Sequence, residues 1–218
     1  MLNIHKLTFN PFSENTYVVA DETKNCAIID PGCSNEKERN ELLTAIQAYG
    51  LKPVLLLNTH CHIDHIPGNK FVFEKFGLLP QIHPLELDIL KNAPQYGKFF
   101  GFDCPVSPEP EKFLNPGDEV KLGNTVLNVL FTPGHSPGSI CFYSAADKAI
   151  ISGDVLFYLS VGRFDLPESN GKDLYNSLVN VMMKLPDDVT VYSGHGPETT
   201  IGFERQNNPF LKDERNFR

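Results

Sequence analysis

Three histidines and one aspartate lie within six residues, directly after an apolar segment. The run Thr59–His65 contains His60, His62, Asp64 and His65, while the whole chain of 218 residues has only 7 histidines. Neutral imidazole is the commonest metal ligand, and a carboxylate suits borderline or hard divalent ions. The run therefore predicts a metal site, and a metal site points to catalysis.

Three further residues of ligand type follow other segments that are predicted as strands. His135, Asp154 and His195 each come soon after an apolar segment and directly after a glycine. In layered α/β proteins, ligands bind at the carboxyl ends of strands. If the four strand ends converge, five histidines and two aspartates meet, which is enough for two metal ions.

The local spacing suggests how the ligands divide between two ions. Residues two apart in extended backbone point the same way, so His60 and His62 can reach one ion. Asp64 and His65 stand where the chain turns toward the next helix, and they can serve a second ion. Asp154, with two carboxylate oxygens, is a natural bridge.

Strand-like and helix-like segments alternate in two halves of similar size. The predicted strands cover 16–20, 26–29, 54–57, 79–83, 119–122, 125–131, 140–143, 149–152 and 189–192, and the predicted helices cover 36–49, 69–76, 84–92 and 171–185. Helices on both faces of central sheets are the natural arrangement for this alternation. We therefore expect an α/β fold in one domain, 1–218.

The segment 93–110 shows no clear period and contains four prolines and four aromatic residues. It predicts a long aromatic loop, which is often functional in a compact domain. Phe99 and its aromatic neighbours either line a substrate channel or are buried as core. Arg163 and Lys172 are candidates for binding a substrate carboxylate, with solvated surface charge as the alternative.

The overall composition indicates which classes of partner and which cellular compartment to expect. The formal charge of −8 argues against nucleic acid, because binding phosphates needs a basic face. The five cysteines are odd in number and scattered, as expected for reduced thiols in a cytoplasmic protein. No signal-peptide pattern and no membrane-spanning apolar run are present, so we expect the cytoplasm and no membrane partner.

Five motifs, in their order along the chain, resemble those of the metallo-β-lactamase fold superfamily. They are Asp30-Pro31-Gly32, Thr59–His65, Pro133-Gly134-His135, Gly153-Asp154 and Gly194-His195-Gly196. The resemblance covers almost the whole chain. It implies a four-layer αββα sandwich of two similar halves.

The resemblance also implies which residues hold which ion. By the family pattern, the first ion is held by His60, His62 and His135. The second ion is held by Asp64, His65 and His195, with Asp154 bridging the two ions. Asp30 would steady the histidine loop from behind the ligands.

Within the superfamily, the chain is most similar to the hydroxyacylglutathione hydrolase (glyoxalase II) group, through residues 162–167, 194–202 and 208–210. An acidic residue at the bridging position, here Asp154, is the pattern of thioester hydrolases. True β-lactamases usually have cysteine there, so antibiotic hydrolysis is not expected. Only 23 residues follow His195 (218 − 195). We therefore expect no C-terminal helical domain to bind glutathione, and the thiol part of the substrate stays open.

The activity implied by the resemblance is hydrolysis of S-lactoylglutathione or a related acyl thioester. Two divalent ions, with zinc expected and iron or manganese as alternatives, acidify a water to the hydroxide that attacks the thioester carbonyl. Asp64 and Asp154 are the predicted catalytic carboxylates. The leaving thiolate has a pKa of roughly 8–9 and needs little help from a general acid.

Other functions stay open at this point. A persulfide dioxygenase of the same fold would hold one iron with His60, His135 and Asp154, and a lactonase would act on cyclic esters. A non-enzymatic metal-binding or redox module is disfavoured, because three or four protein ligands per ion leave the coordination open. Cys61 is expected to be a bystander, with a soft ligand or an oxidation site as the alternative. The oligomeric state is left open.

Overall fold

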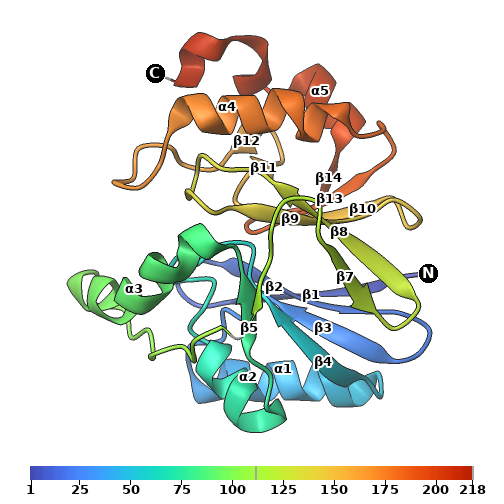
Figure 1. Cartoon of the computed structure of the whole chain (residues 1–218), viewed down its shortest axis with the longest axis vertical. Coiled ribbons are helices and arrows are strands. Elements are labelled where there is room, and N and C mark those ends of the chain that lie inside the picture. Colours follow the sequence, from blue (N-terminus) through green and yellow to red (C-terminus); the bar gives the residue numbers. More distant parts are fainter. Residues whose placement is uncertain (111, 218) are drawn as a thin grey trace.

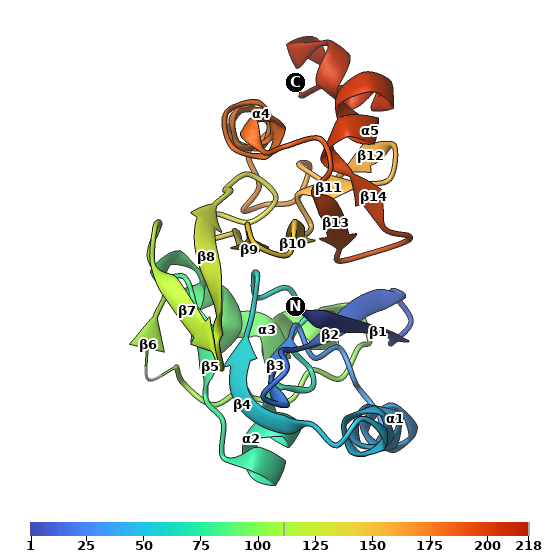
Figure 2. The same cartoon turned by 90° about the vertical axis from the view of Figure 1, so that its right-hand side faces the viewer.

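Two β-sheets packed face to face form the centre of the molecule, and helices cover the outer face of each sheet (Figure 1). The computed structural model describes residues 1–110 and 112–217. A view turned by 90° shows the same succession of helix, sheet, sheet and helix (Figure 2). The predicted αββα order of four layers is therefore confirmed.

The first sheet has six strands that follow one another in chain order. They are β1 (Asn3–Phe9), β2 (Glu14–Ala20), β3 (Asn25–Ile29), β4 (Lys52–Leu57), β5 (Pro80–Ile82) and β6 (Lys112–Phe113). The first three strands pair antiparallel, and β3 to β6 pair parallel. Each parallel pair is joined by a helix, as parallel strands require. These helices are α1 (Glu36–Ala48), α2 (Asn69–Phe76) and α3 (Leu87–Phe99), the last preceded by the 3₁₀ turn Pro84–Glu86.

The second sheet also has six strands, in the order β14-β13-β10-β9-β8-β7. They are β7 (Glu119–Leu122), β8 (Thr125–Phe131), β9 (Ile140–Ser144), β10 (Ala149–Gly153), β13 (Thr190–Ser193) and β14 (Thr199–Thr200). The helices α4 (Gly171–Asn180) and α5 (Ile201–Asn207) cover its outer face (Figure 1). The remaining elements are the hairpin of β11 (Leu156–Phe157) and β12 (Ser160–Val161), and the 3₁₀ turns Met182–Lys184, Phe210–Lys212 and Glu214–Phe217.

Alternate residues of the central strands face different cores. In β2, Tyr17 and Val19 belong to the core between the sheets, while Val18 belongs to the core with Leu42 of α1. Because successive strand residues point to opposite faces, each sheet has two apolar faces to bury. The layers follow from this: one face packs on the other sheet, and the other packs on helices.

The two predicted helices that flank the histidine run are confirmed, although the first ends at Ala48, one residue before its predicted end. Asn35 caps α1, since its side chain accepts a hydrogen bond from the Glu38 amide at 3.1 Å. Gly77 ends α2 in the left-handed region, with a φ of 70°. These helix ends fix the length of chain between β3, β4 and β5, and with it the position of the histidine loop.

The predicted loop over 93–110 is wrong for 93–99, where α3 continues through Pro94. On this helix, Leu90 and Ala93 are buried in one core cluster with side chains of the histidine loop. A proline inside a helix costs about 3 kcal/mol, so burial of this face outweighs the local preference. The helix predicted over 171–185 is also shorter and ends at Asn180, before the 3₁₀ turn.

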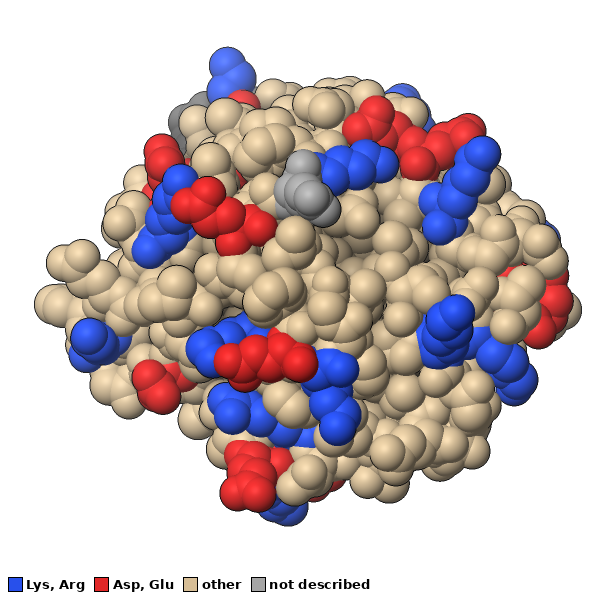
Figure 3. Space-filling model, turned by 60° about the horizontal axis from the view of Figure 1, so that its bottom comes forward, with Lys and Arg blue, Asp and Glu red and all other residues tan. Residues whose placement is uncertain are grey.

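Charged residues of both signs lie next to one another on the face shown in Figure 3, where lysine and arginine side chains are interspersed with aspartate and glutamate. Among the described residues, the helices are too short or too polar to cross a bilayer.

Candidate metal centre

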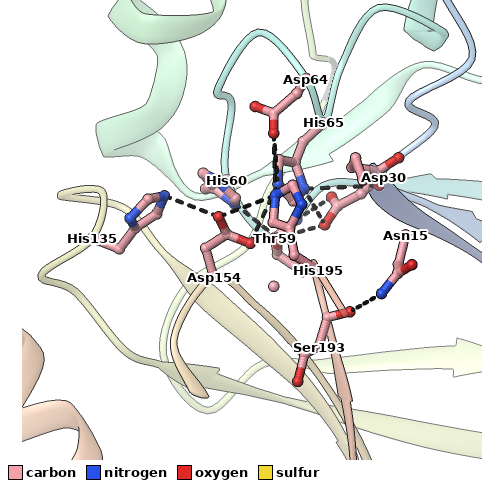
Figure 4. Close-up of polar contacts among 12 residues, drawn as sticks. Asn15, Asp30, Thr59, His60, Asp64, His65, His135, Asp154, Ser193 and His195 are labelled. Atoms are coloured by element: carbon pink, nitrogen blue, oxygen red, sulfur yellow. Dashed lines mark hydrogen bonds and ion pairs between the residues drawn. The ribbon is translucent and has the colours of Figure 1, made fainter. Parts of the chain in front are cut away.

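Residues from the carboxyl ends of four strands meet at one place between the two sheets (Figure 4). The loop after β4 contributes four side chains, and the loops after β8, β10 and β13 contribute one each: His60, His62, Asp64, His65, His135, Asp154 and His195. The strand ends therefore converge as the sequence predicts.

Two groups of three side chains that share no residue can each hold one ion, and a third group, Asp30, His60 and His65, overlaps with both. The ligand atoms of His60, His62 and His135 all lie within 4.8 Å of one another. The same limit holds for a second group, Asp64, His65 and His195. Each group takes two residues from the loop after β4 and one residue from the second sheet. These are the two groups that the family pattern implies.

Asp154 lies between the two groups (Figure 4). Its Oδ2 atom is 3.4 Å from His135 Nε2 and 3.5 Å from His195 Nε2, and its Oδ1 atom is 3.4 Å from His65 Nε2. One carboxylate is thus in contact with both groups. This position suits a ligand that two ions share.

Several buried polar atoms at this centre have no hydrogen-bond partner among the described residues. They are Nε2 of His60, His65 and His135 and Oδ1 of Asp154. Each unsatisfied buried polar group costs about 1–3 kcal/mol. One divalent cation in each group would satisfy these atoms, His60 and His135 in the first group and His65 in the second, with Asp154 beside both, so the donor set fits such ions.

Backbone carbonyl oxygens determine which imidazole nitrogen faces the centre. Nδ1 of His135 is 2.8 Å from the Arg163 carbonyl oxygen, and Nδ1 of His195 is 3.1 Å from that of Phe12. A carbonyl oxygen only accepts, so Nδ1 carries the proton and Nε2 keeps its lone pair. Both imidazoles are therefore held in the tautomer that can bind a metal through Nε2.

Asp30 supports two other histidines. Its Oδ2 atom accepts from the Thr59 hydroxyl at 2.6 Å and lies 3.2 Å from Nδ1 of His65. The Thr59 hydroxyl in turn lies 3.0 Å from Nδ1 of His60. Asp30 thus acts on His65 directly and on His60 through Thr59. It occupies the supporting position that the resemblance implies.

The protonation states of His60, His62 and Asp154 suit metal binding, whereas His65 and His195 would have to release a proton to a metal. Burial opposes protonation of these two imidazoles, but the facing carboxylates, above all Asp64, outweigh it and raise both pKa values, that of His65 well above its usual value. Burial, together with neighbouring imidazoles, holds the pKa of His60 well below its usual value, and burial lowers the pKa of His62 to about 3. Both rings are therefore neutral at pH 7. Burial opposes ionisation of Asp154, but the facing imidazoles, above all His65, outweigh it, so the pKa of Asp154 lies well below its usual value. Asp154 is therefore a carboxylate at pH 7.

Two glycines allow the strand ends to approach one another. A Cβ atom at Gly194 would lie 2.2 Å from Asp154 Oδ1, and one at Gly153 would lie 2.3 Å from the Thr59 hydroxyl oxygen. Gly153 also has a φ of 50°, which favours glycine. The Gly-Asp and Gly-His pairs of the sequence are thus explained by close packing at the centre.

The centre opens into a cavity of about 300 Å³. Besides the ligand residues, apolar and aromatic side chains line it: Phe12, Ile63, Tyr96, Phe100, Phe157 and Leu166. A second cavity of about 170 Å³ shares His62, Ile63 and Tyr96 with the first. The volume of the larger cavity lies at the lower end of the range for small-molecule sites.

The three predicted substrate contacts have different positions. Arg163 lines the larger cavity, but its guanidinium donates to both carboxylate oxygens of Asp165, at 2.9 and 3.0 Å. Phe99 is 85% exposed and does not line this cavity, whereas its neighbour Phe100 does. Lys172 is not among the lining residues either.

Sequence reasoning missed two residues that hold the centre together. Glu14 is fully buried, and its Oε1 atom is 3.9 Å from His65 Nδ1. Asn15 donates through its backbone amide to the Gly194 carbonyl oxygen at 2.7 Å, and through its side chain to that of Ser193 at 3.0 Å. The partners of Asn15 lie about 180 positions away along the chain and His65 lies 51 positions after Glu14 (65 − 14), so the local sequence gives no signal for either role.

Residues 9–195 match the family model described as Metallo-beta-lactamase superfamily. A protein of Bacillus subtilis named probable metallo-hydrolase YqgX is 37% identical over 94% of this chain and 96% of its own length. Hydroxyacylglutathione hydrolase GloC of Haemophilus influenzae is 33% identical over 98% of this chain and 100% of its own length.

Solved structures are similar over nearly the whole chain. BLEG-1 B3 metallo-beta-lactamase superposes with a TM-score of 0.89 at 32% identity, covering 98% of this chain and 100% of that one. TTHA1623 in a di-iron-bound form gives 0.86 at 38% identity, with 95% and 100% covered. ETHE1 from Myxococcus xanthus gives 0.80 at 27% identity, with 99% and 88% covered.

Proposed function

Because the chain belongs to the metallo-beta-lactamase superfamily, we propose that it is a dinuclear metal-dependent hydrolase that cleaves S-lactoylglutathione or a related acyl thioester. The observation that carries the proposal is Asp154, whose carboxylate touches histidines of both ligand groups. An aspartate at this point would offer its carboxylate oxygens to an ion in either group. The similarity to a hydroxyacylglutathione hydrolase supports the choice of substrate.

The proposal assigns a role to each side chain of the centre. The first ion is held by His60, His62 and His135. The second is held by Asp64, His65 and His195, and Asp154 is shared. Asp64 and Asp154 are the catalytic carboxylates, since both lie on the wall of the larger cavity.

When bound, two divalent ions supply Lewis acidity, which brings the pKa of water near neutrality and polarises a carbonyl group. The chain's own contribution is to fix the ligands and exclude solvent. Arg163 and Phe12 hold two imidazoles through their carbonyl oxygens. Aromatic side chains, among them Tyr96 and Phe157, line the cavity in which the acyl group would lie. The thiolate product, with a pKa of roughly 8–9, leaves without a general acid.

Zinc is the proposed metal, with iron and manganese as alternatives. Zinc and iron both accept mixed imidazole and carboxylate ligands. The similarity to TTHA1623 in its di-iron-bound form supports two ions per chain and keeps iron as an alternative.

We further propose one domain spanning 1–218 and a cytoplasmic location. All five cysteines are free and buried, which supports a reducing compartment. The mixed charges on the face shown in Figure 3 support a small molecule over nucleic acid as the partner.

The decisive experiment is hydrolysis of S-D-lactoylglutathione by purified protein of measured metal content, followed through the released thiol. We expect turnover with about two metal ions per chain. Two other substrates are assayed in parallel. Nitrocefin tests β-lactam hydrolysis, because a structure 32% identical to this chain is described as a B3 metallo-beta-lactamase. Glutathione persulfide with an oxygen electrode tests the dioxygenase alternative, which the similarity to ETHE1 supports.

Either of two results would contradict the proposal. One is oxygen consumption with one iron per chain and no thioester cleavage. The other is β-lactam cleavage by fully metal-loaded protein that leaves thioesters intact. In both cases the proposed metal centre would be retained, and only the proposed substrate would have to be replaced.

Asp165 should limit binding of anionic thioesters. In Asp165→Asn, Arg163 loses its ion pair and becomes free to bind a substrate carboxylate. An exposed ion pair is worth about 0.2–1 kcal/mol, so KM for S-lactoylglutathione should fall by up to about 5-fold with kcat unchanged. The control is a neutral N-acetylcysteamine thioester, whose KM should not change. An equal or higher KM for the glutathione ester would exclude Arg163 as a substrate contact.

A further inference from the structure

A second buried carboxylate, on Glu86, joins the two loops that carry the first ligand group. Glu86 is fully buried at the end of the 3₁₀ turn that precedes α3. Its Oε2 atom accepts from the Cys61 amide at 2.8 Å. Its Oε1 atom accepts from the Ser136 hydroxyl at 2.5 Å and from the Gly138 amide at 2.7 Å.

These three donors are placed close to the ligands. Cys61 stands between His60 and His62, and Ser136 directly follows His135. The carboxylate therefore links the backbone of the histidine loop to the backbone of the loop that carries His135. We propose that Glu86 is a positioning residue that sets the distance between these two loops, and thereby the affinity for the ion held by the first group.

Close packing leaves Glu86 little freedom to move. A Cβ atom at Gly138 would lie 2.7 Å from Glu86 Cγ and 2.8 Å from its Oε1. Burial raises the pKa of Glu86, and the hydrogen bonds from Ser136, Cys61 and Gly138 act in the opposite direction. Three hydrogen bonds to one carboxyl group thus fix the two loops to each other, in addition to their own turns.

The second ligand group is held by different residues. The Asp64 carbonyl oxygen accepts from the Asn10 side chain at 2.8 Å, and His65 lies against Asp30. His195 is fixed by the carbonyl oxygen of Phe12. Since none of these contacts involves Glu86, loss of its carboxylate should affect the first ion far more than the second.

A purely structural role for Glu86 is the competing explanation, and the chain offers a matched control. Glu204 is also fully buried, and it accepts from three donors: the Thr199 hydroxyl, the Leu159 amide and the Asn208 side chain. It is not bonded to a loop of the first ligand group. Glu204→Gln should therefore cost stability without a selective effect on metal affinity.

The test measures metal affinity one site at a time, without substrate. Zn²⁺ is titrated into His195→Ala, which keeps the first group, and into His62→Ala, which keeps the second, each with and without Glu86→Gln. In Glu86→Gln, an NH₂ group replaces one of the two carboxylate oxygens. At least one of the three donors then faces another donor and loses its acceptor. We expect about 10–100-fold weaker binding in the His195→Ala background and no change in the His62→Ala background.

A milder variant covers the case in which Glu86→Gln does not fold. Ser136→Ala removes one of the three donors, and it should weaken the first site alone by a smaller factor. Hydrogen exchange of the metal-free protein gives a second measurement, because the Cys61 and Gly138 amides should lose protection when the carboxylate is replaced.

Two results would overturn the inference: equal weakening of both sites, or weakening by Glu204→Gln as large as that by Glu86→Gln. The inference depends on the proposed metal ligands, but not on the proposed substrate. Failure to cleave thioesters would therefore leave it intact. Absence of Zn²⁺ binding to His195→Ala alone would overturn the ligand assignment and the inference together.

Discussion

Replacing Asp154 by asparagine should lower kcat by about 10³-fold or more. An asparagine has the same size but no charge, and only one of its two terminal atoms can bind a metal. The structure has Asp154 in contact with His65, His135 and His195, so both ligand groups lose a shared oxygen. Loss of several kcal/mol of charge stabilisation corresponds to this factor.

The variant is assayed with S-D-lactoylglutathione at saturating metal, beside a matched control. Asp21 is also a buried carboxylate that accepts several hydrogen bonds, but it lies against Thr23 and Asn124, away from the centre. Asp21→Asn should retain the parental kcat. Circular dichroism of both variants should match the parent. Near-parental turnover in Asp154→Asn would rule out a bridging ligand at this position.

Removing the metal should lower the melting temperature by about 8–16 °C for each ion lost. A ligand that binds only the folded state at 1,000 times its Kd contributes about 4 kcal/mol. In a domain of this size, each kcal/mol shifts Tm by about 2–4 °C. The buried unpaired nitrogens and the carboxylate of Asp154 are the atoms that regain partners when the ion returns.

This prediction is tested by differential scanning calorimetry of chelator-treated protein before and after addition of Zn²⁺. Mg²⁺ provides the control, because it prefers six oxygen ligands and dehydrates reluctantly. It should restore little of the lost stability. A Tm that is the same with and without Zn²⁺, at concentrations that saturate activity, would argue against a metal held by buried ligands.

The sequence predicts the fold and the motifs that carry the proposed ligands because both depend on short-range patterns, whereas the division of the ligands between two ions follows from the family resemblance and stays a proposal. The helix ends at Asn35 and Gly77 and the spacing within Thr59–His65 can be read from a few neighbouring residues. The continuation of α3 through Pro94 could not be predicted in this way. It depends on burial of Leu90 and Ala93 against residues that are distant along the chain.

The carboxylates that support the ligands also differ in whether a short sequence motif reveals them. Asp30 is found through its Asp-Pro-Gly motif, whereas Glu14 and Glu86 have no motif of their own. The partners of Glu86 lie 25 to 52 positions away. A buried glutamate in an apolar segment cannot be told from an exposed one until the tertiary contacts are known.

Each ligand group takes two residues from the loop after β4 and one from the second sheet, and this has a consequence for the order of folding. Neither half of the chain carries a complete group, so high-affinity metal uptake must follow docking of the two sheets. Conversely, separation of the sheets breaks both groups in the same event. Metal release during unfolding should therefore report loss of the contact between the halves, even while each half keeps its own secondary structure.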